Sequence, residues 1–205
     1  LNLGFSGSLG GLMALAEGKA DLAGCHLWDA ESNSYNLPFV RRVLPGQAMA
    51  LIRLATRRIG LILPPGNPQH IRNLGDLTRP EVQFINRQAG SGTRVWLEEQ
   101  LKRLGVESAR INGYAQECAT HSDLARAIAE GRATCGLGLE AAARFYNLDF
   151  LPLTGEYYDL VCSQALLSHP AVQALIGWLR SDAARRMLGE LAGYQDDHTG
   201  EILLS

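Results

Sequence analysis

Apolar and polar residues follow a strand, turn, helix, strand order over the first two dozen positions. Residues 1–5 alternate with the two-residue period of a strand, and a glycine-rich turn follows at residues 6–11. Residues 12–16 place apolar side chains at helical spacing, and Gly18 is a typical residue to follow a helix end. Residues 21–24 begin a second extended segment. This order predicts a strand–helix–strand unit at the start of the chain.

Further apolar runs and helical periods continue this alternation. Strands are predicted at residues 48–54, 60–63, 82–85, 150–153 and 159–162. One helix is predicted to start near Ser91 and to end at Gly105, with an inner face formed by Leu97, Leu101 and Leu104. Another is predicted over residues 172–188, with four side chains facing inward: Leu175, Ile176, Leu179 and Met187. Alternating strands and helices with short connections favour an α/β fold built on mostly parallel sheets.

A seven-residue segment occurs twice in the chain. Residues 14–20 read Ala-Leu-Ala-Glu-Gly-Lys-Ala, and residues 127–133 read Ala-Ile-Ala-Glu-Gly-Arg-Ala. In each copy a turn that carries hydroxyl groups precedes the helix, and a short apolar segment follows the glycine. Two similar strand–helix–strand units in one chain predict two related lobes.

The composition of the 205-residue chain is ordinary for a globular protein, with 46% hydrophobic and 20% charged residues. The net charge of −2 provides no basic surface, so we expect no direct contact with nucleic acid. No apolar run reaches the roughly 18 residues of a membrane-spanning helix, and the chain starts at Leu1 without a leader segment. Widely spaced cysteines favour packed, reduced thiols and a cytoplasmic location, with an extracytoplasmic one as the alternative: Cys25, Cys118, Cys135 and Cys162.

The segment at residues 86–94, Asn-Arg-Gln-Ala-Gly-Ser-Gly-Thr-Arg, has the features of an anion site. It follows an apolar stretch and opens a helix, so backbone N–H groups and the hydroxyls of Ser91 and Thr93 converge at the positive end of the helix dipole. Gly92 lets the backbone approach a bound group closely. The other candidate ligand-binding residues flank this turn or lie at other predicted helix starts: Arg87, Arg94, Ser6, Ser8 and Thr120.

Several of these candidates also have a plainer interpretation. Thr-His-Ser-Asp at residues 120–123 fits a helix cap, and capping and ligand binding are equally supported for Thr120. Either flanking arginine alone fits a solvated or lobe-bridging role. His26, close to Asp29, fits a packed and hydrogen-bonded histidine, and residues 156–159 fit hinge packing better than ligand contact.

Catalytic, metal and cofactor motifs are not found in the sequence. The glycine-rich turn lacks the Gly-Lys-Ser/Thr ending of a triphosphate loop, and it is no G-x-G-x-x-G fingerprint. No G-x-S-x-G elbow precedes a helix. Cysteine and histidine do not pair at the spacing of a zinc site. We therefore expect no catalytic residue, no metal site and no cofactor.

A series of segments, taken in order, resembles the type II periplasmic-binding-protein superfamily over nearly the whole chain. They are Ser8 with residues 10–12, and residues 18–24, 65–68, 74–77, 86–94, 113–114, 120–121, 136–138 and 148–150. The resemblance is to the PBP-like domain related to molybdate- and tungstate-binding proteins. That domain is akin to the ligand-binding domains of LysR-type regulators, and it is also found attached to helix-turn-helix or molybdopterin-biosynthesis modules.

This resemblance implies two α/β lobes, each a mostly parallel sheet flanked by helices, joined by crossing strands near residues 53–57 and 154–158. Lobe 1 would comprise residues 1–54 and 157–205, and lobe 2 residues 55–156. A ligand would lie in the cleft between them, with oxyanion contacts on Ser8, on residues 91–93, and on Thr120 or His121. The strand–helix unit that usually precedes the segment at Leu1 in this family is absent from the chain.

We therefore expect a non-enzymatic domain that binds a small oxyanion, with molybdate or tungstate first. The alternative is the effector-sensing domain of a transcription regulator that binds an organic anion. A third hypothesis is an enzyme that acts on a phosphorylated or carboxylated metabolite. The predicted C-terminal helices expose apolar positions, which is compatible with a homodimer. A fused upstream DNA-binding or molybdopterin-biosynthesis domain would fit the family resemblance.

Overall fold

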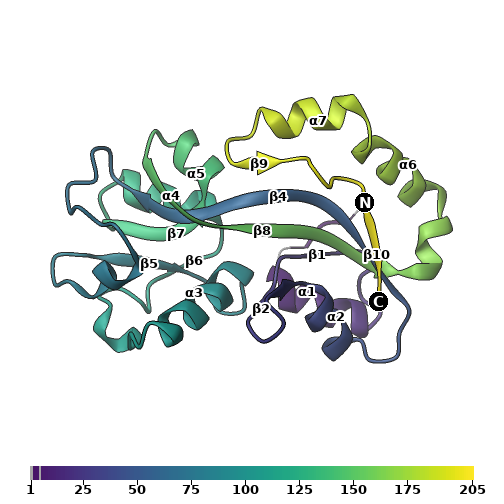
Figure 1. Ribbon diagram of the computed structural model, residues 1–205, viewed down its shortest axis with the longest axis horizontal. Coiled ribbons are helices and arrows are strands. Elements are labelled where there is room, and N and C mark those ends of the chain that lie inside the picture. The colour runs from purple at the N-terminus through teal and green to yellow at the C-terminus, as the bar shows by residue number, and fades with distance from the viewer. Residues whose placement is uncertain (1, 5) are drawn as a thin grey trace. The chain divides into compact units, whose positions relative to one another are not determined.

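The computed structural model describes residues 2–4 and 6–205, which form two compact α/β units (Figure 1). Unit 1 comprises Leu1–Arg57, Gly90–Gly92 and Glu156–Ser205. Unit 2 comprises Arg58–Ala89 and Thr93–Gly155. Two long strands, β4 (Met49–Leu63) and β8 (Asp149–Ser163), run from one unit into the other. Among the described residues, both units share these two strands and one helix, whose first residue lies in unit 1 and the rest in unit 2.

β4 is one continuous strand where the sequence pattern predicts two. Polar residues at positions 56–58 interrupt the apolar pattern, but Thr56 pairs opposite Gln195 and Ile59 opposite Leu139. β8 in the same way joins the two strands predicted within its range. The ladder continues because its hydrogen-bonding groups belong to the main chain and do not depend on side-chain polarity.

Unit 2 holds the central part of the chain. Besides β4 and β8 it contains β5 (Phe84–Arg87), β6 (Glu117–Cys118), β7 (Cys135–Leu139), most of α3 (Gly92–Arg103), α4 (His121–Ala129), α5 (Glu140–Phe145) and the 3-10 turns η1 (Leu74–Thr78) and η2 (Ser108–Arg110). β5 pairs in parallel with β6 and β7, whereas β7 pairs antiparallel with β4. The sheet is therefore mixed rather than mostly parallel as predicted.

Successive residues of β4 face two different hydrophobic clusters in unit 2. Leu61 packs in one cluster with Leu97 and Leu101 of α3. Its neighbour Ile62 packs in the other with Leu124 of α4. Side chains alternate between the two faces of a strand, so a strand covered on both faces is apolar throughout. This explains the uninterrupted apolar run that predicted the strand.

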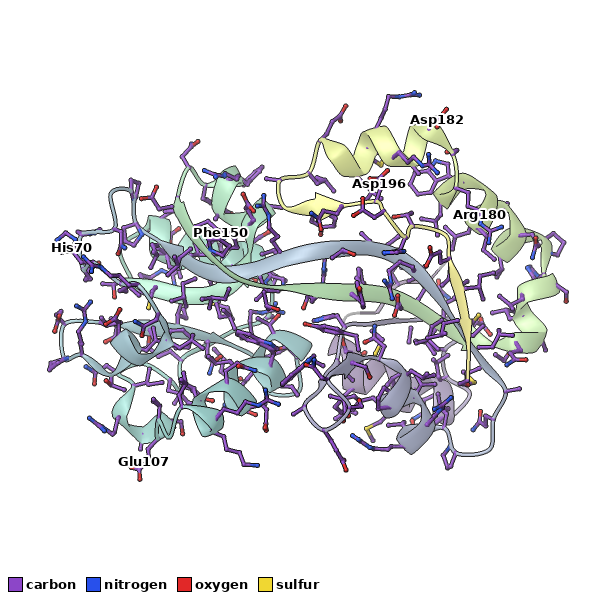
Figure 2. The ribbon with its side chains drawn as sticks, in the orientation of Figure 1. His70, Glu107, Phe150, Arg180, Asp182 and Asp196 are labelled. Carbon is purple, nitrogen blue, oxygen red and sulfur yellow. The ribbon has the colours of Figure 1, made fainter. Side chains whose placement is uncertain are left out.

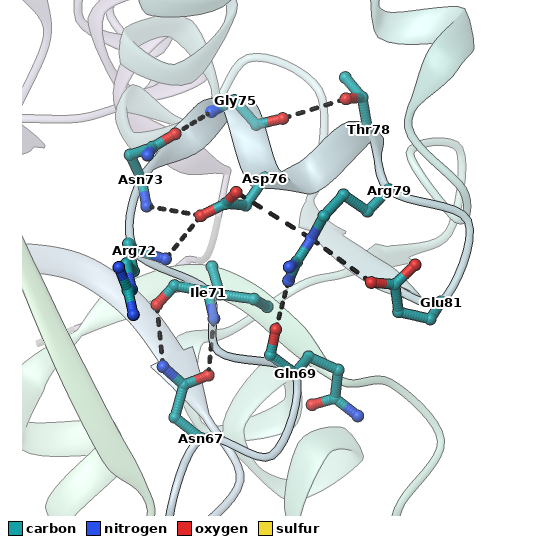
Figure 3. Close-up of polar contacts among 10 residues, drawn as sticks. All are labelled: Asn67, Gln69, Ile71, Arg72, Asn73, Gly75, Asp76, Thr78, Arg79 and Glu81. Atoms are coloured by element: carbon teal, nitrogen blue, oxygen red, sulfur yellow. Dashed lines mark hydrogen bonds and ion pairs between the residues drawn. The ribbon is translucent and has the colours of Figure 1, made fainter.

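The loop that joins β4 to β5 is held by its own polar side chains (Figure 3). Asn67 exchanges two hydrogen bonds with the backbone of Ile71: Nδ2 donates to the carbonyl at 2.8 Å, and Oδ1 accepts from the N–H at 3.0 Å. The Asp76 carboxylate accepts the backbone N–H groups of Arg72 at 2.7 Å and Asn73 at 3.3 Å. Because these side chains satisfy the exposed backbone groups, the loop is ordered by local bonds.

Unit 1 contains the two ends of the chain. Its further elements are α1 (Gly7–Ala16), β1 (Ala23–Cys25), β2 (Trp28–Asp29), β3 (Ser34–Tyr35), α2 (Leu37–Val43), η3 (Gln164–Ser168), α6 (Pro170–Leu179), α7 (Asp182–Gly189), β9 (Tyr194–Gln195) and β10 (Ile202–Leu204). β1 pairs antiparallel with β8, and β9 and β10 pair antiparallel with β4. Within this unit α1 and α2 lie on one side of the strands and α6 and α7 on the other (Figure 1). None of the described helices is long and apolar enough to cross a membrane.

The helix predicted over residues 172–188 is two helices in the structure. Ser181 separates them and caps the second one, because its Oγ accepts the N–H of Ala184 at 3.3 Å. The break changes which side chains face inward, so Met187 is 55% exposed, contrary to the prediction, and Leu188 is buried instead. Arg180, at the end of α6, donates Nε–H to the carbonyl of residue 200 at 3.0 Å and so ties the segment before β10 to the helix (Figure 2).

Two further predictions differ from the structure. Leu104, expected on the inner face of α3, is 58% exposed because the helix ends one residue earlier. A strand was expected over the first five residues, but residues 2–4 form none, and Leu1 and Phe5 lie outside the described residues.

The repeated segment ends a helix in the same way in both units. In α1 and α4 the glycine and the residue after it donate backbone N–H groups to carbonyls three and five positions earlier: Gly18 to Leu15, Lys19 to Ala14, Gly131 to Ile128 and Arg132 to Ala127. Gly18 has φ +67° and Gly131 has φ +73°, a left-handed conformation that favours glycine. The repeated sequence therefore specifies the same helix end once in each unit.

All four cysteines are free, and three of them, Cys25, Cys135 and Cys162, are fully buried. Burial raises the pKa of the Cys25 and Cys135 thiols to about 12, and it also raises the pKa of Cys162. At neutral pH we expect a thiol reagent such as Ellman's to modify the half-buried Cys118 first, and the three buried thiols only on unfolding. Timed labelling followed by mass spectrometry checks this order. Rapid modification of Cys25 or Cys135 in the folded chain would contradict it.

Candidate functional site

β4 and β8 leave unit 1 beside a buried cluster of charged and aromatic side chains. Arg57, the last residue of β4 in this unit, forms an ion pair with Glu156, the first residue of β8 in it. The two are 6% and 3% exposed. The Arg57 guanidinium also lies over the Tyr158 ring, 4.2 Å from its centre. The second carboxylate oxygen of Glu156 is 3.3 Å from His26 Nδ1, so this carboxylate is shared between an arginine and a histidine.

The ion pair keeps both of its members charged inside unit 1. Burial alone would raise the pKa of Glu156, but the charge of Arg57 and then that of His26 outweigh it, and the pKa is lowered. Burial likewise opposes the charge of Arg57, and Glu156 reverses this effect, so the pKa of Arg57 is raised. A buried pair of this kind is stable only while both partners are present.

His26 contacts two of the segments that the sequence predicts to bind ligand. Its backbone N–H donates to Ser8 Oγ at 3.1 Å. It also packs against Gly92: a Cβ at that position would overlap the His26 carbonyl oxygen and Nδ1, and would lie 2.9 Å from Cε1. The imidazole meets the Tyr158 ring edge-on, with 5.7 Å between the ring centres. Ser8 and the turn Gly90–Gly92 therefore meet at this histidine within unit 1.

A buried polar network fixes the loop that carries His26. Asn36 is fully buried; its Oδ1 accepts the N–H of Leu27 at 2.7 Å, and its Nδ2 donates to Asp159 Oδ2 at 2.7 Å. Arg53 pairs with the other carboxylate oxygen of Asp159. Because the residue that follows His26 is bound to this network, the histidine is held from the main chain as well as by its own contacts.

The first turn of α1 carries the two serines of the predicted site. Ser6 is the exposed N-cap residue, and its side chain forms no cap hydrogen bond with the described residues. Ser8 is 1% exposed, and its oxygen accepts the His26 N–H. Since a hydroxyl is both donor and acceptor, Ser8 can anchor the histidine and still donate its proton.

The start of α3 has the strongest features of an anion site. Ser91 and Thr93 are 2% and 1% exposed. The Thr93 hydroxyl oxygen is buried and has no hydrogen-bond partner among the described residues. An unsatisfied buried polar group costs about 1–3 kcal/mol, so a ligand or water is the expected partner. Gly90, with φ +78°, turns the chain into the helix, and the first N–H groups of a helix have no partner within the helix itself.

Arg87 joins β5 to the segment that follows β6. It is 8% exposed, and it donates Nε–H to the Cys118 carbonyl at 3.3 Å and Nη2–H to the Ala119 carbonyl at 2.7 Å. Its own backbone N–H is accepted by Asn86 Oδ1 at 2.9 Å. The side chain therefore has a structural role in unit 2. It also places a buried positive charge at the end of β5, the strand that precedes the turn at residues 90–92.

Arg94, the other predicted flanking cation, pairs with two carboxylates. Its Nε lies 2.8 Å from Glu98 Oε1, and its Nη1 pairs with Glu117. Burial opposes the charge, but the hydrogen bonds and charges of these glutamates outweigh it and raise the pKa of Arg94. The guanidinium also lies over the Tyr114 ring at 5.3 Å. This residue braces α3 against β6 in the present arrangement.

Thr120 and His121 lie at the start of α4. Thr120 caps this helix: Oγ1 accepts the Asp123 N–H at 3.0 Å and donates to Asp123 Oδ2 at 2.7 Å. Its hydroxyl proton is therefore used within the cap. His121 lies beside β7, since a Cβ added to Gly138 would be 3.4 Å from its Nδ1. These two bonds are those that the cap interpretation of Thr120 predicts.

Three charged or polar members of the unit 1 cluster were not among the site residues predicted from the sequence: His26, Arg57 and Glu156. Arg57 and Glu156 are 99 positions apart, so no local motif connects them. The available signal was the presence of charged residues inside each long strand, which does not single out these two. Among the described residues, no three His, Cys, Asp or Glu side chains gather closely enough to hold a metal ion.

The close packing of Gly92 leads to a testable expectation. Gly92→Ala should lower stability by about 1–3 kcal/mol, because its methyl group would force apart the turn and the main chain of His26. Gly177→Ala is the matched control, since a Cβ there meets nothing within 4 Å and the position is helical. Thermal unfolding of both variants checks this. Equal stability of Gly92→Ala and the wild type would show that the turn is not packed as described.

Comparison with known proteins shows the family to which this chain is similar. The model of the PBP-like family, described as a PBP superfamily domain, matches residues 1–180. The protein YvgK of Bacillus subtilis (strain 168) is 38% identical over 200 residues, which cover 98% of this chain and 64% of that protein. The chain therefore spans less than two thirds of the length of this relative.

Solved structures share the fold at low sequence identity. A phosphate ABC transporter substrate-binding protein from Clostridium perfringens, with bound phosphate, has a TM-score of 0.64 and 12% identity, covering 90% of this chain and 82% of that one. The GluR0 ligand-binding core in complex with L-glutamate has a TM-score of 0.59 and 16% identity, covering 92% of this chain and 80% of that one. At these identities the likeness concerns the fold, which is that of two-lobed periplasmic-binding-protein-like structures.

Proposed function

Because the chain belongs to the PBP-like family, we propose that it is a ligand-binding domain for a small anion held at the N-terminus of α3. The observation that carries this proposal is the buried Thr93 hydroxyl, which has no partner among the described residues. The first N–H groups and the dipole of a helix favour negative charge at the same place. The ligand class is also supported by two proteins of similar fold, one with bound phosphate and one with L-glutamate.

Molybdate and tungstate are the ligands that we propose first, on the family resemblance of the sequence. Phosphate and carboxylates follow, because they are the ligands of the two proteins of similar fold. For any of these anions, hydroxyl and N–H donors would replace the hydration shell through charge-assisted hydrogen bonds. Ser91 and Thr93 would supply the hydroxyls, and binding would proceed without chemical turnover. Selectivity would then depend on the number of donors and the size of the space they leave.

Properties of the whole protein stay predictions, since the chain spans 64% of its relative YvgK. They are an effector-sensing role in a transcription regulator, a homodimer, a fused DNA-binding or molybdopterin-biosynthesis domain, and a cytoplasmic location. The exposed Trp178 and Met187 on the C-terminal helices agree with the homodimer. Sedimentation of the purified chain tests the dimer, and the complete gene sequence tests the fusion.

Titration with a panel of anions tests the proposed function. The purified chain is titrated with molybdate, tungstate, sulfate, phosphate and L-glutamate, with heat and melting temperature recorded together. A ligand that binds only the folded state should stabilise it by about 2.7 kcal/mol at a concentration of 100 times Kd. Saturable heat with a matching rise in melting temperature for one anion would support the proposal and rank the anions. The absence of both signals for all five would overturn it.

A further inference from the structure

His26 lies between the two glycine- and serine-rich segments that the proposed function uses. Its main chain bonds to Ser8 at the start of α1, and its ring and carbonyl pack against Gly92 at the start of α3. The side chain is 14% exposed. His26 therefore contacts the first turn of α1 through Ser8 and the first residue of α3, Gly92. A side chain in this position is placed to touch an anion held there.

The charge of this site depends on the protonation of one residue. Arg57 and Glu156 form a closed ion pair, so their charges cancel. The Glu156 oxygen near His26 Nδ1, at 3.3 Å, can accept the proton of that nitrogen. A neutral His26 then leaves the cluster uncharged, whereas a protonated one adds a full positive charge beside the proposed ligand site.

Histidine is the one residue type among the described side chains at this position whose ordinary titration range includes neutral pH. The described neighbours from each packed element are Ser8 of α1, Gly92 of the turn, and Glu156 and Tyr158 of β8, with Arg57 of β4 behind the carboxylate. Glutamate, tyrosine and arginine side chains ordinarily change charge well outside the interval in which histidine does.

We infer that His26 is a ligand-contacting residue that makes anion affinity depend on pH, with tighter binding when the imidazole is protonated. This inference rests on the proposed function and names a residue that contributes to it. Glu156 has the positioning role, because its carboxylate oxygen lies 3.3 Å from Nδ1 and would stabilise an added proton electrostatically. At acidic pH the affinity for dianions should rise more than the affinity for monoanions, since a cation attracts the greater charge more strongly.

The test measures the Kd of molybdate by calorimetry from about pH 6 to about pH 8.5, an interval that includes ordinary histidine titration. The wild type, His26→Gln and His70→Gln are compared; His70 lies in an exposed loop of unit 2. Glutamine keeps a hydrogen-bond donor at position 26 but cannot take up the proton. Circular dichroism and thermal unfolding establish that each variant is folded.

The wild type and His70→Gln should lose affinity as the pH rises, by up to about tenfold per pH unit where one proton is coupled to binding. His26→Gln should bind weakly at every pH and show no slope. Binding without pH dependence in the wild type, or an unchanged slope in His26→Gln, would overturn the inference and leave the proposed function standing. Failure of the wild type to bind molybdate or any other anion of the panel at any pH would overturn both.

Discussion

Replacing Ser91 and Thr93 together by alanine should weaken anion binding by roughly a hundredfold or more. Each hydroxyl is expected to give a charge-assisted hydrogen bond worth about 1.5–3 kcal/mol, and two such bonds correspond to at least two orders of magnitude in Kd. Both side chains are almost fully buried, so water cannot readily take their place. Calorimetry with the tightest-binding anion of the panel measures the change.

The stability of the unliganded chain serves as the control that the double variant is still folded. Thr93→Ala removes a buried hydroxyl that lacks a partner among the described residues, so the unliganded chain should be unaffected or slightly more stable. A control variant, Thr78→Ala with Ser168→Ala, removes two hydroxyls that lie outside the start of α3. Each of them donates to a nearby carbonyl at 3.0 Å. It should bind as the wild type does. Unchanged affinity in the Ser91/Thr93 variant would remove the anion site from the start of α3.

Glu156→Gln should destabilise unit 1 by about 3–5 kcal/mol. The change leaves the guanidinium of Arg57 buried without its counter-charge, and the loss of one partner is the costly way to break a buried ion pair. Urea unfolding followed by circular dichroism measures the loss, and hydrogen exchange assigns it to a unit. Replacing both partners, Arg57→Met with Glu156→Leu, should recover most of the stability because neither position then holds an unpaired buried charge.

An exposed ion pair offers the matched comparison. Lys19 and Glu17 lie 2.7 Å apart, but their side chains are 73% and 50% exposed. Glu17→Gln should leave the unfolding curve unchanged, since water screens such pairs. If Glu156→Gln also left the unfolding curve unchanged, the buried cluster would not stabilise unit 1.

Because the pKa of Glu156 is lowered, the stability that this cluster contributes depends on pH. A carboxylate whose folded pKa is depressed contributes stability above its unfolded pKa, about 4.3, and loses that contribution as the pH falls below it. The wild type should therefore lose stability on acidification, and Glu156→Gln should lose less over the same interval. Parallel acid unfolding curves for the two proteins would contradict the assignment.

Much of the fold follows from patterns within short segments. The inner face of α3 was predicted from its spacing, and Leu97 and Leu101 are buried as expected. The double occurrence of Ala-x-Ala-Glu-Gly gives the same helix end in each unit because glycine provides the left-handed residue both times. The patterns fail where a local rule is overridden: β4 runs through polar positions, and a serine divides the last predicted helix.

The candidate site was predictable only where it is local in the sequence. Ser91, Gly92 and Thr93 lie in one glycine-rich turn whose chemistry is apparent from composition. His26 and Glu156 are ordinary residues in the sequence, and their meaning comes from a contact across 130 positions of chain. Long-range contacts of this kind depend on strand pairing and register, and no spacing rule in a single sequence supplies them.

A crystal structure of the chain with the tightest-binding anion of the panel tests the central claim most directly. We predict that the anion lies at the N-terminus of α3, within hydrogen-bond distance of the Thr93 hydroxyl that has no partner among the described residues. Ser91 should be a second ligand. An anion bound elsewhere on the chain, with Thr93 unchanged and the start of α3 empty, would contradict the account.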